Sequence, residues 1–131
     1  MSRVLVVDAS VAVDLLARFR PEPIETLLWA DDTVLAAPEL ITVEVLQALR
    51  RLDRVGAIPR SRKSLPDLLR MLPIRTYRHG ALLAGMWKLR SNLSAYDAAY
   101  VALARVLQAT LVTRDSKLAS APDLGVPVEV P

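Results

Sequence analysis

Four acidic residues lie in segments whose pattern is otherwise apolar. Asp8 follows the apolar run at residues 4–7, and Asp115 comes two residues after Thr113, where a second such run ends. Glu44 lies in a helical pattern whose neighbours at helical spacing are mostly apolar. Asp97 is the single acid in a segment that is apolar nearly all round, which is typical of a buried helix. The candidate site residues are therefore Asp8, Glu44, Asp97 and Asp115.

Each of these acids also has a structural explanation. Aspartate is a common turn and capping residue, which covers Asp8 and Asp115. Glu44 could lie at a helix border and reach solvent, and Asp97 could form a capping box with Ser94. Together, however, several partly buried carboxylates would repel each other unless a cation or strong hydrogen bonds compensated their charge. A hard divalent cation would do so, and it would also activate water and neutralise charge on a phosphoryl group.

The order of elements predicts that these acids share one edge of a sheet. We expect strands at residues 4–7, 33–36, 73–77 and 110–113, and an edge strand at 126–130. We expect helices at residues 10–17, from Pro21 toward Trp29, from Pro38 to about Val55, at 65–72, 80–90 and 94–108, and a short one near Asp115. Strands that alternate with helices predict an α/β fold with a mostly parallel sheet covered on both faces. Ligands bind beyond the carboxyl ends of such strands, where Asp8 and Asp115 would lie.

Composition narrows the class of protein. The 131 residues are enough for one domain over 1–131, and an apolar fraction of 53% allows a real core. With no cysteine and one histidine, His79, the chain has no disulfide framework, zinc-thiolate site or multi-histidine metal site. No apolar run reaches the length of a membrane span, and a charge comes too early for a signal peptide. We therefore expect a soluble, cytoplasmic protein.

Basic residues are concentrated in one stretch of the chain. The net charge is +3, and the excess is mostly arginine, which favours bidentate contacts with phosphate. The stretch contains Arg50, Arg51, Arg54, Arg60, Arg62 and Lys63. These side chains could follow a nucleic-acid backbone, or they could equally form a solvated face.

The remaining polar and aromatic residues are predicted to have no catalytic role. Asp14 should face solvent on the first helix, and His79 has no partner motif nearby. The aromatic side chains could stack on bases, but core packing is the better expectation for Trp29, Trp87, Tyr96 and Tyr100.

Four segments of the chain resemble the PIN domain, in particular the small ribonuclease toxins of the VapBC toxin–antitoxin type. They are residues 6–10, residues 38–40 with Glu44, residues 93–104 and residues 111–115. Their order and the chain length match, so the resemblance covers essentially the whole sequence, and no acidic position is lost. It implies a three-layer α/β/α PIN-like domain with a mostly parallel central sheet.

The resemblance also implies an activity. It assigns Asp8, Glu44, Asp97 and Asp115 to an acidic site for Mg²⁺ or Mn²⁺, in which Glu44 binds metal or orients the attacking water. Ser10 and Thr113 look like hydroxyls that orient carboxylates. The implied reaction is hydrolysis of RNA phosphodiester bonds, the implied partners are a second copy of the chain and a VapB-like antitoxin that blocks the site, and the arginine-rich stretch could contact that antitoxin.

Two other functions are open at this point. A phosphatase with an aspartate nucleophile would place that residue after its first strand, but such enzymes typically show Asp-x-Asp where this chain has Asp8-Ala9-Ser10. A catalytically silent binding or scaffold module could use the same fold, although the intact set of four acids argues against it. Metal-dependent cleavage of RNA discriminates among the three.

Overall fold

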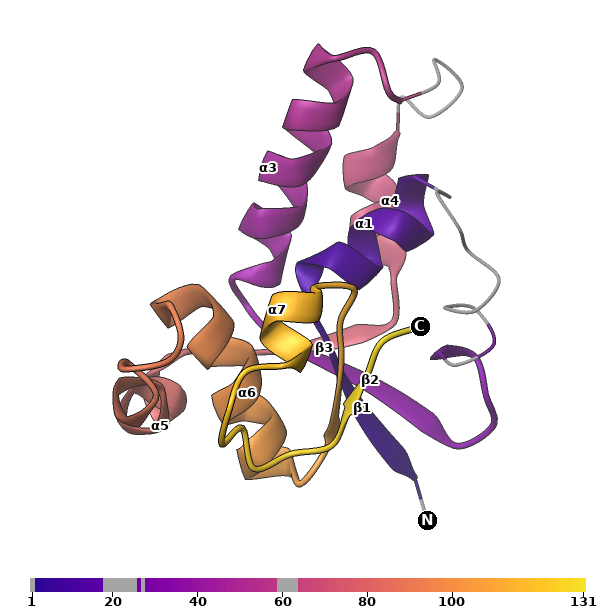
Figure 1. The fold of residues 1–131 in the computed structure, drawn as a ribbon. Helices are drawn as coiled ribbons and strands as arrows, with labels where there is room; N and C mark the ends of the chain where they lie inside the picture. The colour runs from indigo at the N-terminus through magenta and orange to yellow at the C-terminus, as the bar shows by residue number, and fades with distance from the viewer. Residues whose placement is uncertain (1, 18–25, 27, 59–63) are drawn as a thin grey trace.

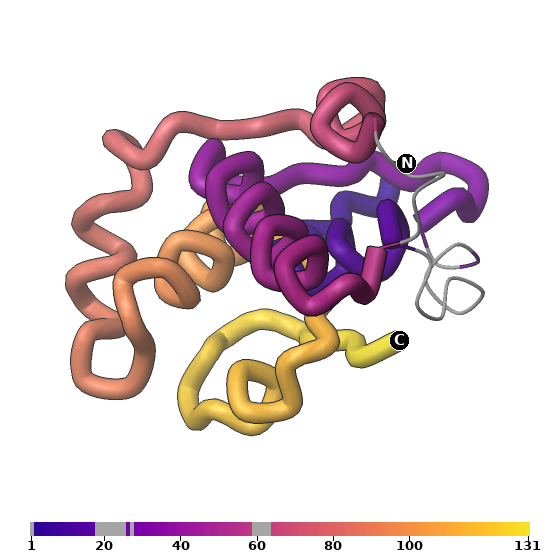
Figure 2. The backbone as a smooth tube through the Cα atoms, turned by 90° about the horizontal axis from the view of Figure 1, so that it is seen from above, coloured from indigo at the N-terminus to yellow at the C-terminus, as the bar shows by residue number. Residues whose placement is uncertain are grey.

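The computed structural model describes residues 2–17, 26, 28–58 and 64–131. Within them, five strands form one sheet in the order β3-β2-β1-β4-β5, and every neighbouring pair is parallel. The strands are β1 (Arg3–Val7), β2 (Thr33–Pro38), β3 (Ile74–Tyr77), β4 (Thr110–Val112) and β5 (Val128–Glu129). The two edge strands lie on opposite sides of the molecule, as Figure 2 shows from above. The expected parallel sheet is confirmed.

Helices cover both faces of this sheet. They are α1 (Ala9–Ala17), α3 (Ile41–Arg54), α4 (Leu65–Met71), the 3₁₀ helix η2 (Gly80–Leu82), α5 (Leu83–Lys88), α6 (Ala95–Leu107) and α7 (Ser116–Ala119). Helix α6 packs on β1, β2 and β4, and α5 packs on α6. Helix α1 contacts α3 and α4, and Figure 1 shows these three grouped together, away from α5 and α6. The result is the three-layer α/β/α architecture expected from the sequence.

The most buried segments are those with continuous apolar sequence. Leu5, Val6 and Val7 of β1 are fully buried, as expected for a central parallel strand that is covered on both faces. Helix α6 is buried from Ala98 to Ala104, which explains why its sequence is apolar nearly all round. Asp8 follows β1 and Asp97 lies in the first turn of α6, so both acids are carried by deeply buried elements.

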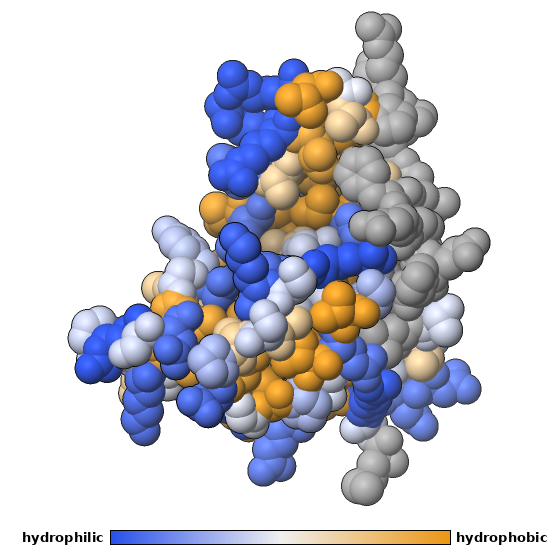
Figure 3. All heavy atoms as spheres, in the orientation of Figure 1, coloured by the Kyte–Doolittle hydropathy of each residue, from blue (hydrophilic) through white to orange (hydrophobic). Residues whose placement is uncertain are grey.

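Helix α3 is amphipathic. It buries Ile41, Val45 and Leu49 along one stripe, at the spacing of helical turns. Figure 3 shows hydrophilic residues along its outer edge and hydrophobic ones toward α1 and α4. Its last turn carries Arg51 and Arg54. Glu44 therefore lies on a helix with one face bound to the core and the other toward solvent.

The boundaries of two elements differ from the prediction. Helix α3 was expected to begin at Pro38, but β2 continues through Pro38 and the helix begins at Ile41. Ala37 and Pro38 continue the ladder with Thr76 and Tyr77 of β3, a long-range pairing that the local pattern does not show. The segment expected as one helix over 80–90 is a 3₁₀ turn followed by α5.

The helix expected from Pro21 toward Trp29 falls mostly on residues 18–25 and 27, which lie outside the described residues. Within the described part of the chain, no helix combines the length and apolar character needed to span a membrane.

Candidate active site

Asp8 is held in place by the pairing of the central strand β1 with its neighbour β4. Val7 of β1 lies opposite Val112 of β4, and the backbone N–H of Asp8 donates to the carbonyl of Val112 at 3.1 Å. This register brings Asp8 beside Thr113, whose hydroxyl donates to Asp8 Oδ2 at 2.5 Å. The Ser10 hydroxyl donates to Oδ1 at 2.5 Å. Both predicted hydroxyls therefore contact the same carboxylate, which is only 7% exposed.

The protonation of Asp8 is set by opposing effects. Burial raises the pKa of its carboxyl group because the charged form loses hydration. Hydrogen bonds from Ser10, Thr113 and the N–H of Val11 favour the charged form and lower the pKa in part. The net result is a raised pKa. A cation beside this carboxylate would remove much of that penalty.

Asp115 is linked to Asp8 through Thr113. The Thr113 hydroxyl accepts the backbone N–H of Asp115 at 2.9 Å while it donates to Asp8. Asp115 caps α7, since its Oδ1 accepts the N–H groups of Lys117 at 2.9 Å and Leu118 at 3.4 Å. The capping explanation is therefore correct for Asp115, and this residue lines the same pocket as Asp8 as well.

Glu44 meets a tyrosine from another helix. The Tyr100 hydroxyl donates to Glu44 Oε1 at 2.6 Å. Burial raises the pKa of Glu44, the hydrogen bond from Tyr100 lowers it in part, and the charges of Asp97 and Asp8 raise it further. Burial and the bond to Glu44 raise the pKa of Tyr100, so its phenol stays protonated as a donor.

Asp97 lies in the first turn of α6. Its backbone N–H donates to the Ser94 hydroxyl at 3.2 Å, so the expected N-cap is confirmed. Burial and the charge of Asp115 raise the pKa of the Asp97 carboxyl group, and a hydrogen bond with Ser94 lowers it in part. Asp97 therefore interacts electrostatically with two other acids, Glu44 and Asp115.

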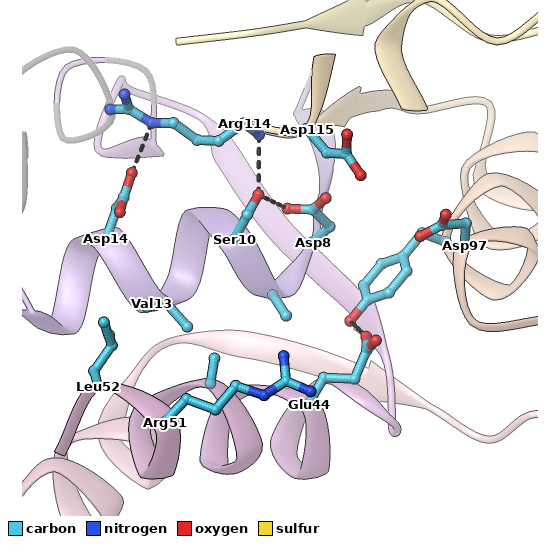
Figure 4. Close-up of a pocket in the computed structure, with 13 residues that line it drawn as sticks. Asp8, Ser10, Val13, Asp14, Glu44, Arg51, Leu52, Asp97, Arg114 and Asp115 are labelled. Carbon is cyan, nitrogen blue, oxygen red and sulfur yellow. Dashed lines mark hydrogen bonds and ion pairs between the residues drawn. The ribbon is translucent and has the colours of Figure 1, made fainter. Parts of the chain in front are cut away.

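One pocket of about 750 Å³ is lined by all four predicted acids, and Figure 4 shows them around it. The carboxylate oxygens that line this pocket are the kind of ligand that suits a hard cation such as Mg²⁺. Among the described residues, however, no group of three or more His, Cys, Asp or Glu side chains is arranged so that it could hold a metal as it stands. The four acids thus line one pocket and interact electrostatically. Their side chains would have to rotate before they could coordinate one cation together.

Several residues of this pocket were not predicted. Asp14, expected in solvent, forms an ion pair with Arg114 Nε at 2.9 Å and lines the pocket, so that prediction was wrong. Its spacing of four from Ser10 puts both on one face of α1, and this was the available signal. Tyr100 was expected only as core, and its hydroxyl reaches Glu44 because α6 places Asp97 and Tyr100 on one face.

The expectation of core packing is correct for one of the four aromatic residues and wrong for the other three. Trp29, Trp87 and Tyr96 are exposed rather than packed in the core, whereas Tyr100 is buried. Apolar character alone does not decide burial, because a small domain leaves many apolar atoms at its surface. His79 has a structural contact, since its Nε2 accepts the N–H of Leu40 at 3.1 Å.

The arginine-rich stretch is only partly described. Arg50, Arg51 and Arg54 are exposed on α3, and of these Arg51 lines the acidic pocket. Figure 4 shows its side chain extended toward Glu44. The other three predicted residues, Arg60, Arg62 and Lys63, lie outside the described residues.

A parallel sheet with this strand order and an acidic pocket at its carboxyl edge matches a known family. The chain belongs to the PIN domain family, whose model matches residues 5–124. It is similar to the VapC ribonuclease Mb0985 of Mycobacterium bovis, with 39% identity over 129 residues, 96% of this chain and 97% of that protein. It is also similar to ribonuclease VapC1 of Mycobacterium tuberculosis, with 39% identity over 127 residues, 95% of this chain and 94% of that protein.

The fold has a counterpart among solved structures. A chain of VapBC2 from Rickettsia felis, bound to a DNA fragment from its promoter, superposes with a TM-score of 0.70 at 15% identity. The match covers 96% of this chain and 97% of that one. At this identity the likeness concerns the fold alone.

Proposed function

We propose that this protein is a metal-dependent endoribonuclease that hydrolyses RNA phosphodiester bonds and acts as the toxin of a toxin–antitoxin pair. The observation that carries the proposal is the pocket in which Asp8, Glu44, Asp97 and Asp115 meet at the carboxyl edge of the sheet. Relatives named as VapC ribonucleases, at 39% identity over nearly the whole chain, support it.

The four carboxylates would hold Mg²⁺ or Mn²⁺, because their oxygen atoms suit a hard cation and their mutual repulsion favours one. When bound, such a cation lowers the pKa of water and neutralises charge on a phosphoryl group. Ser10 and Thr113 keep the Asp8 carboxylate in one orientation. Glu44 would bind the metal or orient the attacking water, and Tyr100 holds the Glu44 carboxylate through a hydrogen bond from its hydroxyl.

The contacts of Asp8 disfavour the phosphatase alternative. Its Oδ1 accepts hydrogen bonds from Ser10 and from the Val11 N–H, and its Oδ2 accepts one from Thr113. A carboxylate held through both oxygens in this way is well suited to a fixed ligand role and poorly suited to forming a covalent bond to phosphorus.

We also propose a cytoplasmic homodimer that binds a VapB-like antitoxin. Large apolar side chains are exposed on α3 and α5, at Val43, Leu46 and Leu83, and exposed apolar surface of this kind favours a protein–protein interface. A toxin–antitoxin complex from Klebsiella pneumoniae contains a chain of the same fold, with a TM-score of 0.58, which is consistent with such a partner. Light scattering that gives the monomer mass at micromolar concentration would contradict the dimer.

The test of the enzymatic proposal is cleavage of a mixed RNA pool by the purified protein, in EDTA, Mg²⁺ and Mn²⁺. We expect cleavage only with metal, and loss of it in Asp97→Asn, with circular dichroism to confirm the fold. The matched control is Asp67→Asn, because Asp67 is exposed on α4 and does not line the pocket. Cleavage in EDTA, or wild-type rates in Asp97→Asn, would refute the proposed site.

A further inference from the structure

A second hollow adjoins the acidic pocket. Its volume is about 560 Å³, and Glu44 lines both cavities. The other lining residues come from the loop before α3, the start of that helix, β3, the turn between β3 and η2, and the first turn of α6: Glu39, Leu40, Thr42, Val43, Thr76, His79 and Tyr96. A ligand whose reacting phosphate lay in the acidic pocket would therefore extend its neighbouring group into this hollow.

Tyr96 presents an open aromatic ring to the second hollow. Its side chain is 65% exposed, although a tyrosine ring normally buries a large apolar area. Successive residues of a helix point about 100° apart. The first turn of α6 therefore places Asp97 in the acidic pocket and the adjacent Tyr96 in the second hollow. Because Ser94 caps this turn, the backbone that carries both side chains is held in place.

The hollow also offers polar groups at its wall. The Leu40 N–H donates to His79 Nε2, so in the neutral imidazole the other nitrogen, Nδ1, carries the proton and is a donor. The Thr42 hydroxyl donates to the Glu39 carbonyl at 3.1 Å, which leaves its lone pairs as acceptors. Glu39 adds an exposed carboxylate. The hollow thus combines an aromatic ring, the apolar Leu40 and Val43, and a few polar groups. This combination suits the binding of a planar heteroaromatic ligand.

We propose that this hollow is a nucleobase subsite, in which Tyr96 stacks on the base next to the phosphodiester bond that is cleaved. The inference rests on the proposed ribonuclease function and adds a determinant of substrate choice. Base–aromatic stacking tolerates every base, whereas a carboxylate such as Glu39 accepts hydrogen bonds from exocyclic amino groups. The subsite should therefore favour bases that carry an amino group over uracil.

The experiment measures RNA binding in EDTA at low salt, so that no cleavage interferes. The probe is a short single-stranded RNA with one 2-aminopurine, whose fluorescence is quenched when it stacks. Tyr96→Ala should weaken binding about 5- to 10-fold, at the low end for a stacking residue, and should abolish the quenching. Tyr96→Phe should keep wild-type binding and wild-type quenching, because stacking needs only the aromatic ring. Changing flanking bases to uracil should weaken binding to the wild type.

The matched control is Trp87→Ala. Trp87 is 68% exposed on α5, lines neither cavity and stacks with Arg90. An equal loss in Trp87→Ala would overturn the subsite, as would wild-type binding by Tyr96→Ala or the absence of binding by the wild type. A change in oligomeric state of Tyr96→Ala with unchanged RNA binding would also overturn it and indicate a protein contact instead.

The two proposals fail separately in this design. If binding and quenching depend on Tyr96 while no metal supports cleavage, the ribonuclease proposal fails and the subsite stands. If cleavage depends on metal and Asp97 while Tyr96→Ala binds and cleaves like the wild type, the subsite fails and the ribonuclease proposal stands.

Discussion

Replacement of Thr113 by valine should destabilise the protein by more than its small change in shape suggests. The Thr113 side chain is 0% exposed, donates to Asp8 Oδ2 at 2.5 Å and accepts the Asp115 N–H at 2.9 Å. A hydrogen bond to a charged group contributes about 1.5–3 kcal/mol and one between neutral groups about 0.5–1.5 kcal/mol. The added methyl group recovers about 1 kcal/mol. We expect a net loss of about 1–3.5 kcal/mol in the free energy of unfolding.

Thermal unfolding at neutral pH measures this loss. For a chain of 131 residues, each kcal/mol corresponds to about 4 °C in melting temperature, so Thr113→Val should melt about 4–14 °C below the wild type. RNA cleavage should fall about 10- to 100-fold as well, because Asp8 loses a group that orients it. A melting temperature within about 2 °C of the wild type would refute the reasoning.

The loss should depend on pH in a definite direction. The folded-state pKa of Asp8 is raised above 3.8, so its contribution favours folding at acidic pH and is lost as pH rises through the folded pKa. The Thr113 hydrogen bond lowers that pKa in part, so valine at this position raises it further. The difference in stability between wild type and variant should therefore grow as pH rises, and shrink toward pH 3.8 and below.

The control for this variant is Thr33→Val. The Thr33 hydroxyl is buried at the start of β2, and in the described part of the chain it has no hydrogen-bond partner. The same substitution there removes an unsatisfied polar atom, so it should be neutral or stabilising and show no pH dependence. Equal losses in the two variants would mean that shape, and not the hydrogen bonds of Asp8, explains the effect.

Three further predictions concern the site. Tyr100→Phe removes the donor that lowers the pKa of Glu44, so the acidic limb of the cleavage rate should move to higher pH, and an unmoved limb would argue against a role for Glu44. Arg51→Gln should weaken RNA binding and reduce the slope of log affinity against log salt by at most about 0.7. Arg50→Gln, on the same helix but not lining the pocket, should change the RNA affinity and the salt slope less. Equal effects of the two variants would indicate only a general effect of net charge. Mg²⁺ or Mn²⁺ at ~100 times its dissociation constant should stabilise the wild type by about 2.7 kcal/mol. Thermal melts should show most of this gain missing in Asp97→Asn, which in EDTA should be no less stable than the wild type, and a full metal shift in that variant would remove Asp97 from the ligands.

Much of the fold could be predicted because its signals are local. The β-branched run of β1 and the apolar stripe of α3 are properties of adjacent residues, and both elements form where that pattern predicts them, apart from the start of α3. The Ser94 cap of α6 is equally local. The start of α3 was placed at Pro38 because the ladder that extends β2 depends on β3, a strand far away in the chain.

The sequence by itself determined which acids could form a site, because Asp8 and Asp115 follow buried strands and parallel strands end at one edge of the sheet. Only the tertiary structure decided which groups hold them. The register of β1 against β4 brings Thr113 to Asp8, and the position of α6 relative to the start of α3 brings Tyr100 to Glu44. These contacts join residues 105 and 56 positions apart. No periodic pattern encodes them, because a side-chain hydrogen bond depends on the relative position of two elements and not on the residues adjacent to either.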